Sequence, residues 1–170
     1  TALKEAVLKT RPKLDALRWG FVVGEWLIPT ASSMINVEDA ALLSVQAFFL
    51  QQNKCYDDAI TLYGEIIDLK PDLDWPYNDR GLVYAEGKQE YDRAIEDFNR
   101  ALEISPRLAE VYNNRGNAYA GKGLYDQAIS DYTIAVEINP RHAGAYNNRG
   151  RAYAEGKQEY DRAIEDFNRA

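Results

Sequence analysis

The sequence predicts an all-α fold in which antiparallel helix pairs repeat along the chain, and three observations support this prediction. The segment YAEGKQEYDRAIEDFNRA occurs twice, at 84–101 and 153–170, and the two copies start 69 positions apart. Small and large residues recur at spacings of three and four, as they do on one face of an α-helix. Glycine-containing turns and prolines punctuate the pattern. Since one helix pair cannot bury its own apolar face, neighbouring pairs are expected to stack.

Composition narrows the function classes. The chain has 170 residues, of which 46% are hydrophobic and 28% charged, and its formal net charge is −7. This acidic balance argues against nucleic acid and against an anionic membrane surface as partners. No run of eighteen apolar residues exists, so no membrane-spanning helix is expected. The single cysteine, Cys55, cannot form an internal disulfide, which fits a reducing, cytoplasmic location.

Residues 1–39 do not follow the repeat and are expected to form a helical segment of their own. The stretch 19–28 is apolar on nearly every side, which calls for burial all round. Two interpretations remain open: the segment caps the first helix pair, or it docks on another chain through Trp19 and Trp26. The sequence PTASSMIN that follows indicates a loop, in which Asn36 serves as the N-cap of the next helix.

Four units follow, each with a first helix, a turn and a second helix. Their expected bounds are 40–73, 74–108, 109–142 and a truncated 143–170. Tyr77, Tyr112 and Tyr146 occupy one column, and the steps between them are 35 and 34 residues. The difference arises in the turn, which reads EGKQEY in the second and fourth units and GKGLY in the third.

The first helix of each unit places a small residue four positions after its Tyr or Leu, and a large residue three positions further on. The second helix carries a buried stripe of alanines and aromatic rings. Small residues are expected to let the two helices of a pair approach closely, and the rings are expected to fill the gaps between neighbouring pairs. The stripe comprises Ala59, Tyr63, Ile66; Ala94, Phe98, Ala101; Ala128, Tyr132, Ala135; and Ala163, Phe167, Ala170.

These columns resemble the tetratricopeptide repeat family, and the resemblance covers residues 40–170. It implies a right-handed superhelical solenoid of antiparallel helix pairs, whose first helices line a concave groove. It also implies protein binding in that groove as the usual work of the chain. The fourth unit stops inside its second helix, so the chain is expected to be a fragment of a longer array. Its exposed last helix pair, or the Trp19/Trp26 segment, is then a place for self-association.

Arginine stands where the family usually has an apolar residue, just before the small residue of the first helix. An aspartate precedes the aromatic ring of the partner helix in the same three units, whereas the first unit has Gln46 and Leu62 in the two columns. Because the columns change together, we expect structural ion pairs rather than a free anion site. The pairs are Arg80–Asp97, Arg115–Asp131 and Arg149–Asp166.

The groove residues that the resemblance implies are rich in asparagine, which is a poor residue inside a helix. A row of side-chain amides one repeat apart can bind the backbone of an extended peptide, because each amide offers a donor and an acceptor. Alternatively, the amides are solvated or bond to a neighbouring helix pair. The candidate residues for partner binding are Asn78, Asp79, Leu82, Glu110, Asn113, Asn114, Asn117, Asn147, Asn148 and Arg151.

The charge of these residues indicates the kind of partner. The family's clamp for acidic C-termini needs cations where this chain has Asn113 and Gly144, so that clamp is rejected. A protein or peptide segment that is neutral or basic suits the amide and acidic groups better. The alternative function is a regulatory arm, or a substrate-delivery arm, of a larger protein or enzyme.

No catalytic or metal-binding pattern is found. His142 stands alone in an inter-repeat turn and is expected to face solvent, and Cys55 has no histidine nearby in the sequence. No cysteine and histidine cluster has metal-ligand spacing, and no phosphate-binding loop is present. The sequence therefore predicts a binding protein without enzymatic activity, metal or cofactor.

Overall fold

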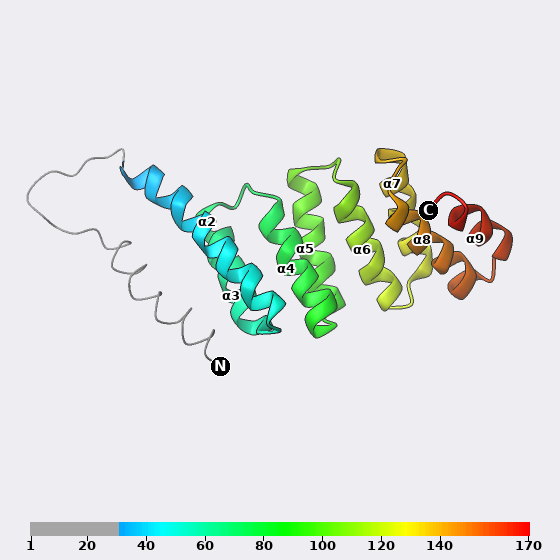
Figure 1. The fold of residues 1–170 in the computed structure, drawn as a ribbon, viewed down its shortest axis with the longest axis horizontal. Coiled ribbons are helices and arrows are strands. Elements are labelled where there is room, and N and C mark those ends of the chain that lie inside the picture. The colour runs from blue at the N-terminus through cyan, green and yellow to red at the C-terminus, as the bar shows by residue number, and fades with distance from the viewer. Residues whose placement is uncertain (1–30) are drawn as a thin grey trace, which may run out of the picture. The chain divides into compact units, whose positions relative to one another are not determined.

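The structure is a computed structural model that describes residues 31–170, with side chains from residue 40 onward. All regular elements in that part of the chain are helical, which confirms the expected all-α fold of helix pairs (Figure 1). The helices are α2 (Ala31–Gln52), α3 (Tyr56–Leu69), α4 (Trp75–Leu82), α5 (Tyr91–Ile104), α6 (Ala109–Gly121), α7 (Tyr125–Ile138), α8 (Ala143–Arg151) and α9 (Tyr160–Phe167). Within residues 31–170, none of them has the length and apolar character that crossing a bilayer would require. The chain divides into two units after Pro71, with α2 and α3 in the first and α4 to α9 in the second.

In the first unit, α2 packs against α3. The loop expected over PTASSMIN is wrong from Ala31 onward, because α2 already begins there and Asn36 lies inside the helix rather than at its N-cap. The segment from Ala31 to Asn36 contains no glycine or proline, so nothing in it interrupts a helix. Of the expected cap or docking segment at 1–39, residues 1–30 lie outside the described residues, and 31–39 form the start of α2.

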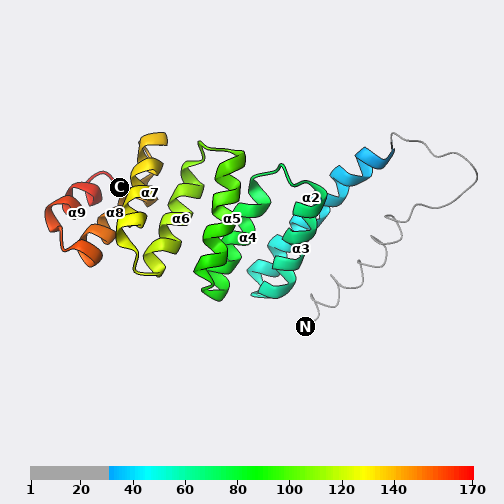
Figure 2. The same ribbon diagram turned by 180° about the vertical axis from the view of Figure 1, so that it is seen from behind.

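The second unit contains three helix pairs, in which each helix packs against the next one along the chain. The pairs are α4 with α5, α6 with α7, and α8 with α9, and they lie side by side in both views (Figures 1 and 2). In the α6–α7 pair, Gly116 faces the ring of Tyr132 so closely that a Cβ at Gly116 would lie 2.6 Å from Tyr132 Cε1. The same close approach recurs between Gly81 and Phe98 and between Gly150 and Phe167. The small residues therefore allow the expected close approach within each pair, whereas the rings, which the sequence placed between pairs, contact the glycine of their own pair.

The extra residue of the EGKQEY turn is absorbed by a π-helical turn. One follows α4 at Val83–Lys88 and another follows α8 at Ala152–Lys157, whereas α6 runs without one to Gly121. Each π-helical turn ends at a glutamine in the left-handed region, with φ 57° at Gln89 and Gln158. A π-turn adds one residue to a helix without ending it. The second helix therefore starts at the equivalent position in the 34-residue and 35-residue units.

Candidate functional site

The arginine column forms bidentate ion pairs within each helix pair. Arg115 Nε donates to Asp131 Oδ2 at 2.7 Å, and Arg115 Nη2 donates to Asp131 Oδ1 at the same distance. The same two bonds join the partners expected from the sequence in the other pairs, Arg80–Asp97 and Arg149–Asp166. All three aspartates are buried. Because the arginines have carboxylate partners, they do not form a free anion site.

Each of two arginines also reaches the preceding helix pair. Arg115 Nη1 donates to Asn99 Oδ1 at 2.6 Å, and Arg149 Nη1 donates to Thr133 Oγ1 at 3.1 Å. The guanidinium of Arg115 also lies over the Tyr112 ring, 5.3 Å from its centroid. The hydrogen bond to Asp131 raises the pKa of Arg115, which keeps it charged. This column therefore holds the stack of helix pairs together.

Two of the asparagines expected in an open groove are buried, and this part of the expectation is wrong. Asn113 and Asn114 are each only 6% exposed. Asn114 Nδ2 donates to Asn78 Oδ1 at 3.0 Å, and Asn148 Nδ2 donates to Asn113 Oδ1 at 3.0 Å. These bonds link consecutive helix pairs, because the columns that contain Asn113 and Asn114 both lie beside the neighbouring pair. The alternative interpretation from the sequence, amides bonded to a neighbouring pair, therefore describes these residues.

The remaining candidate residues stay accessible to different degrees. Glu110, Asn117, Asn147 and Arg151 are exposed, whereas Asn78, Asp79, Leu82 and Asn148 are half-buried. Burial raises the pKa of Asp79, and this effect exceeds the opposing effect of the hydrogen bond that its carboxylate accepts from Asn78. The structure brings Asn117, Asn148 and Arg151 together at one pocket and does not bring the other candidates there.

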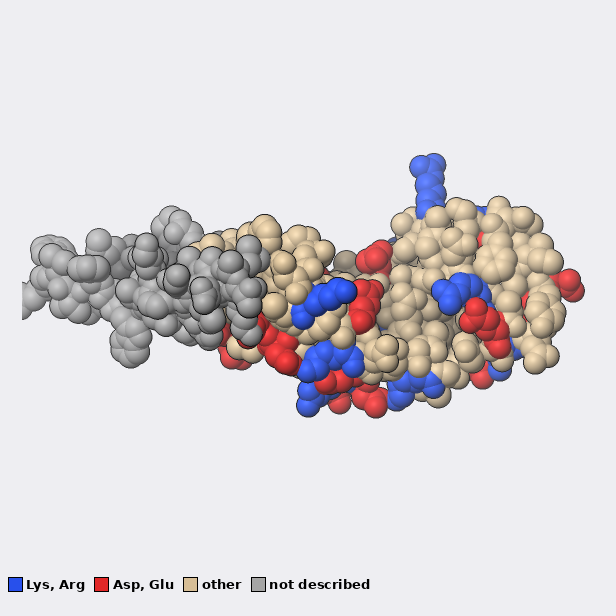
Figure 3. Space-filling model, turned by 60° about the horizontal axis from the view of Figure 1, so that its bottom comes forward, with Lys and Arg blue, Asp and Glu red and all other residues tan. Residues whose placement is uncertain are grey.

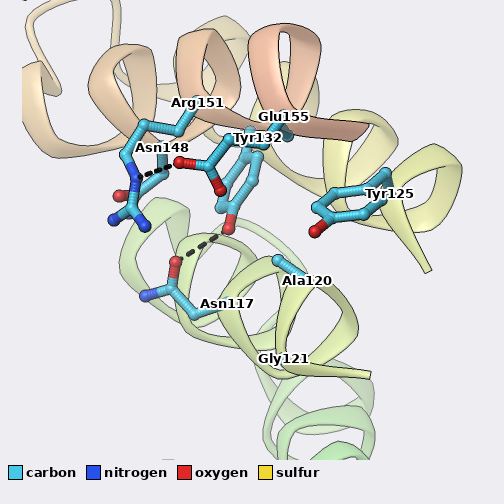
Figure 4. A pocket seen from close by; sticks show the side chains of 9 residues that line it. Asn117, Ala120, Gly121, Tyr125, Tyr132, Asn148, Arg151 and Glu155 are labelled. Carbon is cyan, nitrogen blue, oxygen red and sulfur yellow. Dashed lines mark hydrogen bonds and ion pairs between the residues drawn. The ribbon is translucent and has the colours of Figure 1, made fainter. Parts of the chain in front are cut away.

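This pocket lies between the α6–α7 pair and the start of the last helix pair, and its volume is about 340 Å³ (Figure 4). Rings and small residues form its apolar part, and amide and charged side chains form its polar part. Nine residues line it: Asn117, Ala120, Gly121, Tyr125, Tyr132, Asn148, Arg151, Ala152 and Glu155.

Hydrogen bonds fix the orientation of the polar groups of the pocket. The Tyr132 hydroxyl donates to Asn117 Oδ1 at 2.8 Å, as the dashed line in Figure 4 shows. Burial raises the pKa of Tyr132, so its hydroxyl remains a donor. On the rim, Arg151 Nε lies 3.6 Å from Glu155 Oε1. The two opposite charges leave the rim with no net charge.

His142 does not face solvent as the sequence indicated. It is the N-cap of α8, where its Nδ1 accepts a hydrogen bond from the Ala145 amide at 3.3 Å. Its Nε2 lies 3.0 Å from Glu110 Oε2, and only 14% of the side chain is exposed. A residue that caps a helix in this way has a structural role. Among the described residues, no cluster of three or more His, Cys, Asp and Glu side chains has the arrangement of a metal site.

The sequence interpretation missed two aromatic residues of the pocket, because Tyr132 was assigned to the buried stripe and Tyr125 to the turn GKGLY. A signal for Tyr132 exists in the repeat columns. The second unit has Leu82 and Phe98 where the third has Asn117 and Tyr132, so a polar pair replaces an apolar pair. This signal is weaker than that of the arginines and aspartates, because the first unit has Phe48 with Tyr63 and the fourth has Arg151 with Phe167.

Solved structures similar to this chain contain helical repeats. A crystal structure of MamA has a TM-score of 0.70 and 26% identity, and the match covers 76% of this chain and 75% of MamA. MamA from Desulfovibrio magneticus RS-1 has a TM-score of 0.70 and 21% identity, covering 98% of this chain and 90% of that one. The first TPR of Spaghetti (RPAP3), bound to the HSP90 peptide SRMEEVD, has a TM-score of 0.66 and 22% identity, covering 69% and 93%. No curated protein sequence matches the chain.

Models of the tetratricopeptide repeat family match the chain from residue 88, inside the second unit, to residue 170. "TPR repeat" matches residues 88–123, and "Tetratricopeptide repeat" matches residues 109–142 and, separately, 143–170. The matched segments contain the α6–α7 and α8–α9 pairs, their glycine and aromatic contacts and the pocket described above. Residues 88–170 of this chain belong to the tetratricopeptide repeat family.

Proposed function

We propose that this chain is a protein-interaction scaffold that binds an extended, uncharged or basic segment of a partner along the first helices of its second unit. One observation carries the proposal: the pocket presents an oriented donor beside an oriented acceptor. Asn117 Oδ1 accepts from Tyr132, so the Asn117 amide nitrogen lies on the other side of the amide group and can act as a donor. Asn148 Nδ2 donates to Asn113, so the Asn148 Oδ1 is available as an acceptor. An extended peptide backbone offers the complementary carbonyl and amide groups.

The fold supports this use, because one similar TPR domain was solved with a bound peptide, SRMEEVD. That peptide is acidic, whereas Asn113 and Gly144 occupy the positions where binding of an acidic C-terminus requires cations. The charges in this chain are also distributed differently from those of a cationic clamp. On the face in Figure 3, basic and acidic side chains lie next to one another and form no patch of a single sign. These features support a neutral or basic segment.

The test uses immobilised extended peptides of defined sequence, grouped into acidic, neutral and basic sets. The chain is compared with the variant Asn117→Ala/Asn148→Ala, and Gln127→Ala, which removes an exposed amide from α7, is the matched control. We expect binding to neutral or basic peptides that falls in the double variant and persists in the control. The comparison is valid only if the three proteins give the same melting curve, which shows that the substitutions leave the fold intact. Preference for the acidic set, or equal binding by the double variant, would contradict the proposal.

A further inference from the structure

The pocket between the last two helix pairs differs in chemistry from the equivalent place one repeat earlier. Asn117 and Tyr132 occupy the columns that hold Leu82 and Phe98 in the preceding pair. The hydroxyl of Tyr132 is bonded to Asn117, so the two polar residues function together. An apolar pair fills these columns without difficulty in the same chain. Helix packing therefore does not require the polar pair. This indicates that Asn117 and Tyr132 have a role in the pocket.

The rim of the pocket disfavours a charged ligand group. Arg151 and Glu155 lie opposite each other with 3.6 Å between Nε and Oε1. A carboxylate in the pocket would be attracted by Arg151 and repelled by Glu155, and an ammonium group would experience the reverse, so neither charge gains a net attraction. Each ligand charge would also have to separate two charges that already attract each other. An uncharged group avoids both costs.

The interior of the pocket offers donors and acceptors in balance. The Asn117 amide nitrogen is a donor, and the Asn148 carbonyl oxygen and the Tyr132 oxygen are acceptors. The rings of Tyr125 and Tyr132, with Ala152, supply apolar walls on which a planar group can stack. The group that combines a donor, an acceptor and a planar uncharged shape is a primary amide.

We propose that this pocket binds the side-chain amide of a glutamine or asparagine in the partner segment, and that the Asn117–Tyr132 pair determines this preference. The inference rests on the proposed function, since the amide belongs to the bound segment. An aliphatic side chain of similar size fits less well, because it would cover the Asn117 nitrogen without giving it an acceptor. If the pocket held only water, the hydrogen bond from Tyr132 that orients the Asn117 nitrogen would serve no purpose.

The experiment exploits the apolar pair that the chain itself provides. In the double variant Asn117→Leu/Tyr132→Phe, the third helix pair receives the residues of the second. Probes are neutral peptides in which each position in turn is varied through all amino acids. For the unaltered chain, we expect one position at which Gln or Asn binds about tenfold more tightly than Leu or Met. In the double variant that preference reverses, while binding determined at the other positions persists.

Two further proteins keep the outcome interpretable. Gln127→Ala is the surface control and should retain the Gln or Asn preference. Tyr132→Phe alone removes the hydroxyl that orients Asn117, and it should weaken the preference even if the double variant is too unstable to test. If no peptide binds the unaltered chain, the proposed function and this inference both fail. If peptides bind but no position prefers an amide, or if the preference survives both variants, only the amide pocket is overturned.

Discussion

The buried Arg115–Asp131 pair illustrates how single residues support this fold. Its aspartate is 5% exposed and its arginine 18%, so both charges are largely removed from water. The pair is held by two hydrogen bonds, and a third bond from Arg115 reaches Asn99 in the preceding helix pair. Burying charges is tolerated only when each has its partners. The contribution of such a pair is therefore seen when one partner is removed.

The first unit provides a natural replacement for this pair, Gln46 and Leu62. We expect Asp131→Leu alone to destabilise the chain by roughly 3 kcal/mol, because it leaves a buried guanidinium without its carboxylate. The double variant Arg115→Gln/Asp131→Leu should be closer to the unaltered chain, since it removes both charges. Free energies of unfolding from urea titrations measure both effects. Equal losses in the two variants would contradict this account of the pair.

A second prediction concerns Asp79 and pH. Burial raises the pKa of Asp79 above its ordinary value, so its ionised form is penalised in the folded chain. Its contribution to stability is present below the pKa of the unfolded chain and is lost as the pH rises through the folded pKa. Asp79→Asn, which installs the residue found at Asn114 and Asn148, should therefore raise the urea midpoint at pH 7. The gain should disappear below about pH 4.

The control for this prediction is Asp92→Asn, because Asp92 is exposed and forms an ion pair with Lys122. Asp92→Asn should give no gain at pH 7. A pH-independent gain from Asp79→Asn would assign its effect to something other than ionisation.

Some residues of the site could be predicted from the sequence, and others could not. The ion pairs could be predicted, because four units of one chain show the two columns changing together. The burial of Asn113 and Asn114 could not, because it depends on how closely consecutive helix pairs approach. That distance follows from three-dimensional packing, and helical periodicity alone does not specify it. Periodicity also placed Tyr132 correctly in the stripe but did not reveal that its hydroxyl reaches Asn117.

At the scale of elements, the turn within each helix pair has a fixed backbone requirement. The residue two positions before the second helix adopts a positive φ in each pair: 59° at Lys54, 57° at Gln89 and Gln158, and 75° at Gly123. Only the third unit uses glycine there. The left-handed conformation is strained for a residue with a Cβ, so the other turns keep it at some cost.

Gly123→Ala tests this requirement without a steric side effect, because a Cβ at Gly123 would meet nothing within 4 Å. We expect a loss of about 1 kcal/mol in the free energy of unfolding, from backbone strain alone. Gly144→Ala is the opposite case, because Gly144 lies within α8 and its Cβ would come no closer than 3.4 Å to His142. That substitution should stabilise the chain by roughly 0.5 kcal/mol. Thermal and urea unfolding measure both, and a loss at both sites would contradict the argument.

At the scale of the whole molecule, the array of helix pairs determines which apolar surface is covered. In the third pair, Tyr125 and Ile129 are packed beside Ala152 of the next pair. In α9, the equivalent Tyr160 and Ile164 are 61% and 57% exposed. Exposed apolar surface of this kind favours association, so self-association through the last helix pair, expected from the sequence, stays a prediction.

Sedimentation velocity over a range of concentrations tests this prediction. If the last helix pair binds a second copy of the chain, the average mass should rise with protein concentration. Ile164→Lys should reduce the rise, because it places a charge in the apolar contact. Gln127→Lys, at an exposed position of α7, is the control for the added charge. A single species at every concentration would remove self-association through α9.

The π-helical turns have a consequence for how the repeat varies in length. In the second unit, Glu90 N donates to Tyr84 O at 2.9 Å. In the third unit, Leu124 N donates to Tyr119 O, also at 2.9 Å. The first of these bonds closes a loop that is one residue longer than the second. Both turns therefore deliver the chain to the same starting point, and the inserted residue shifts no downstream contact. A one-residue insertion, which would rotate every later side chain of an uninterrupted helix by about 100°, is confined here to six residues. Units of unequal length can thus stay in register in space, although they are out of phase in the sequence.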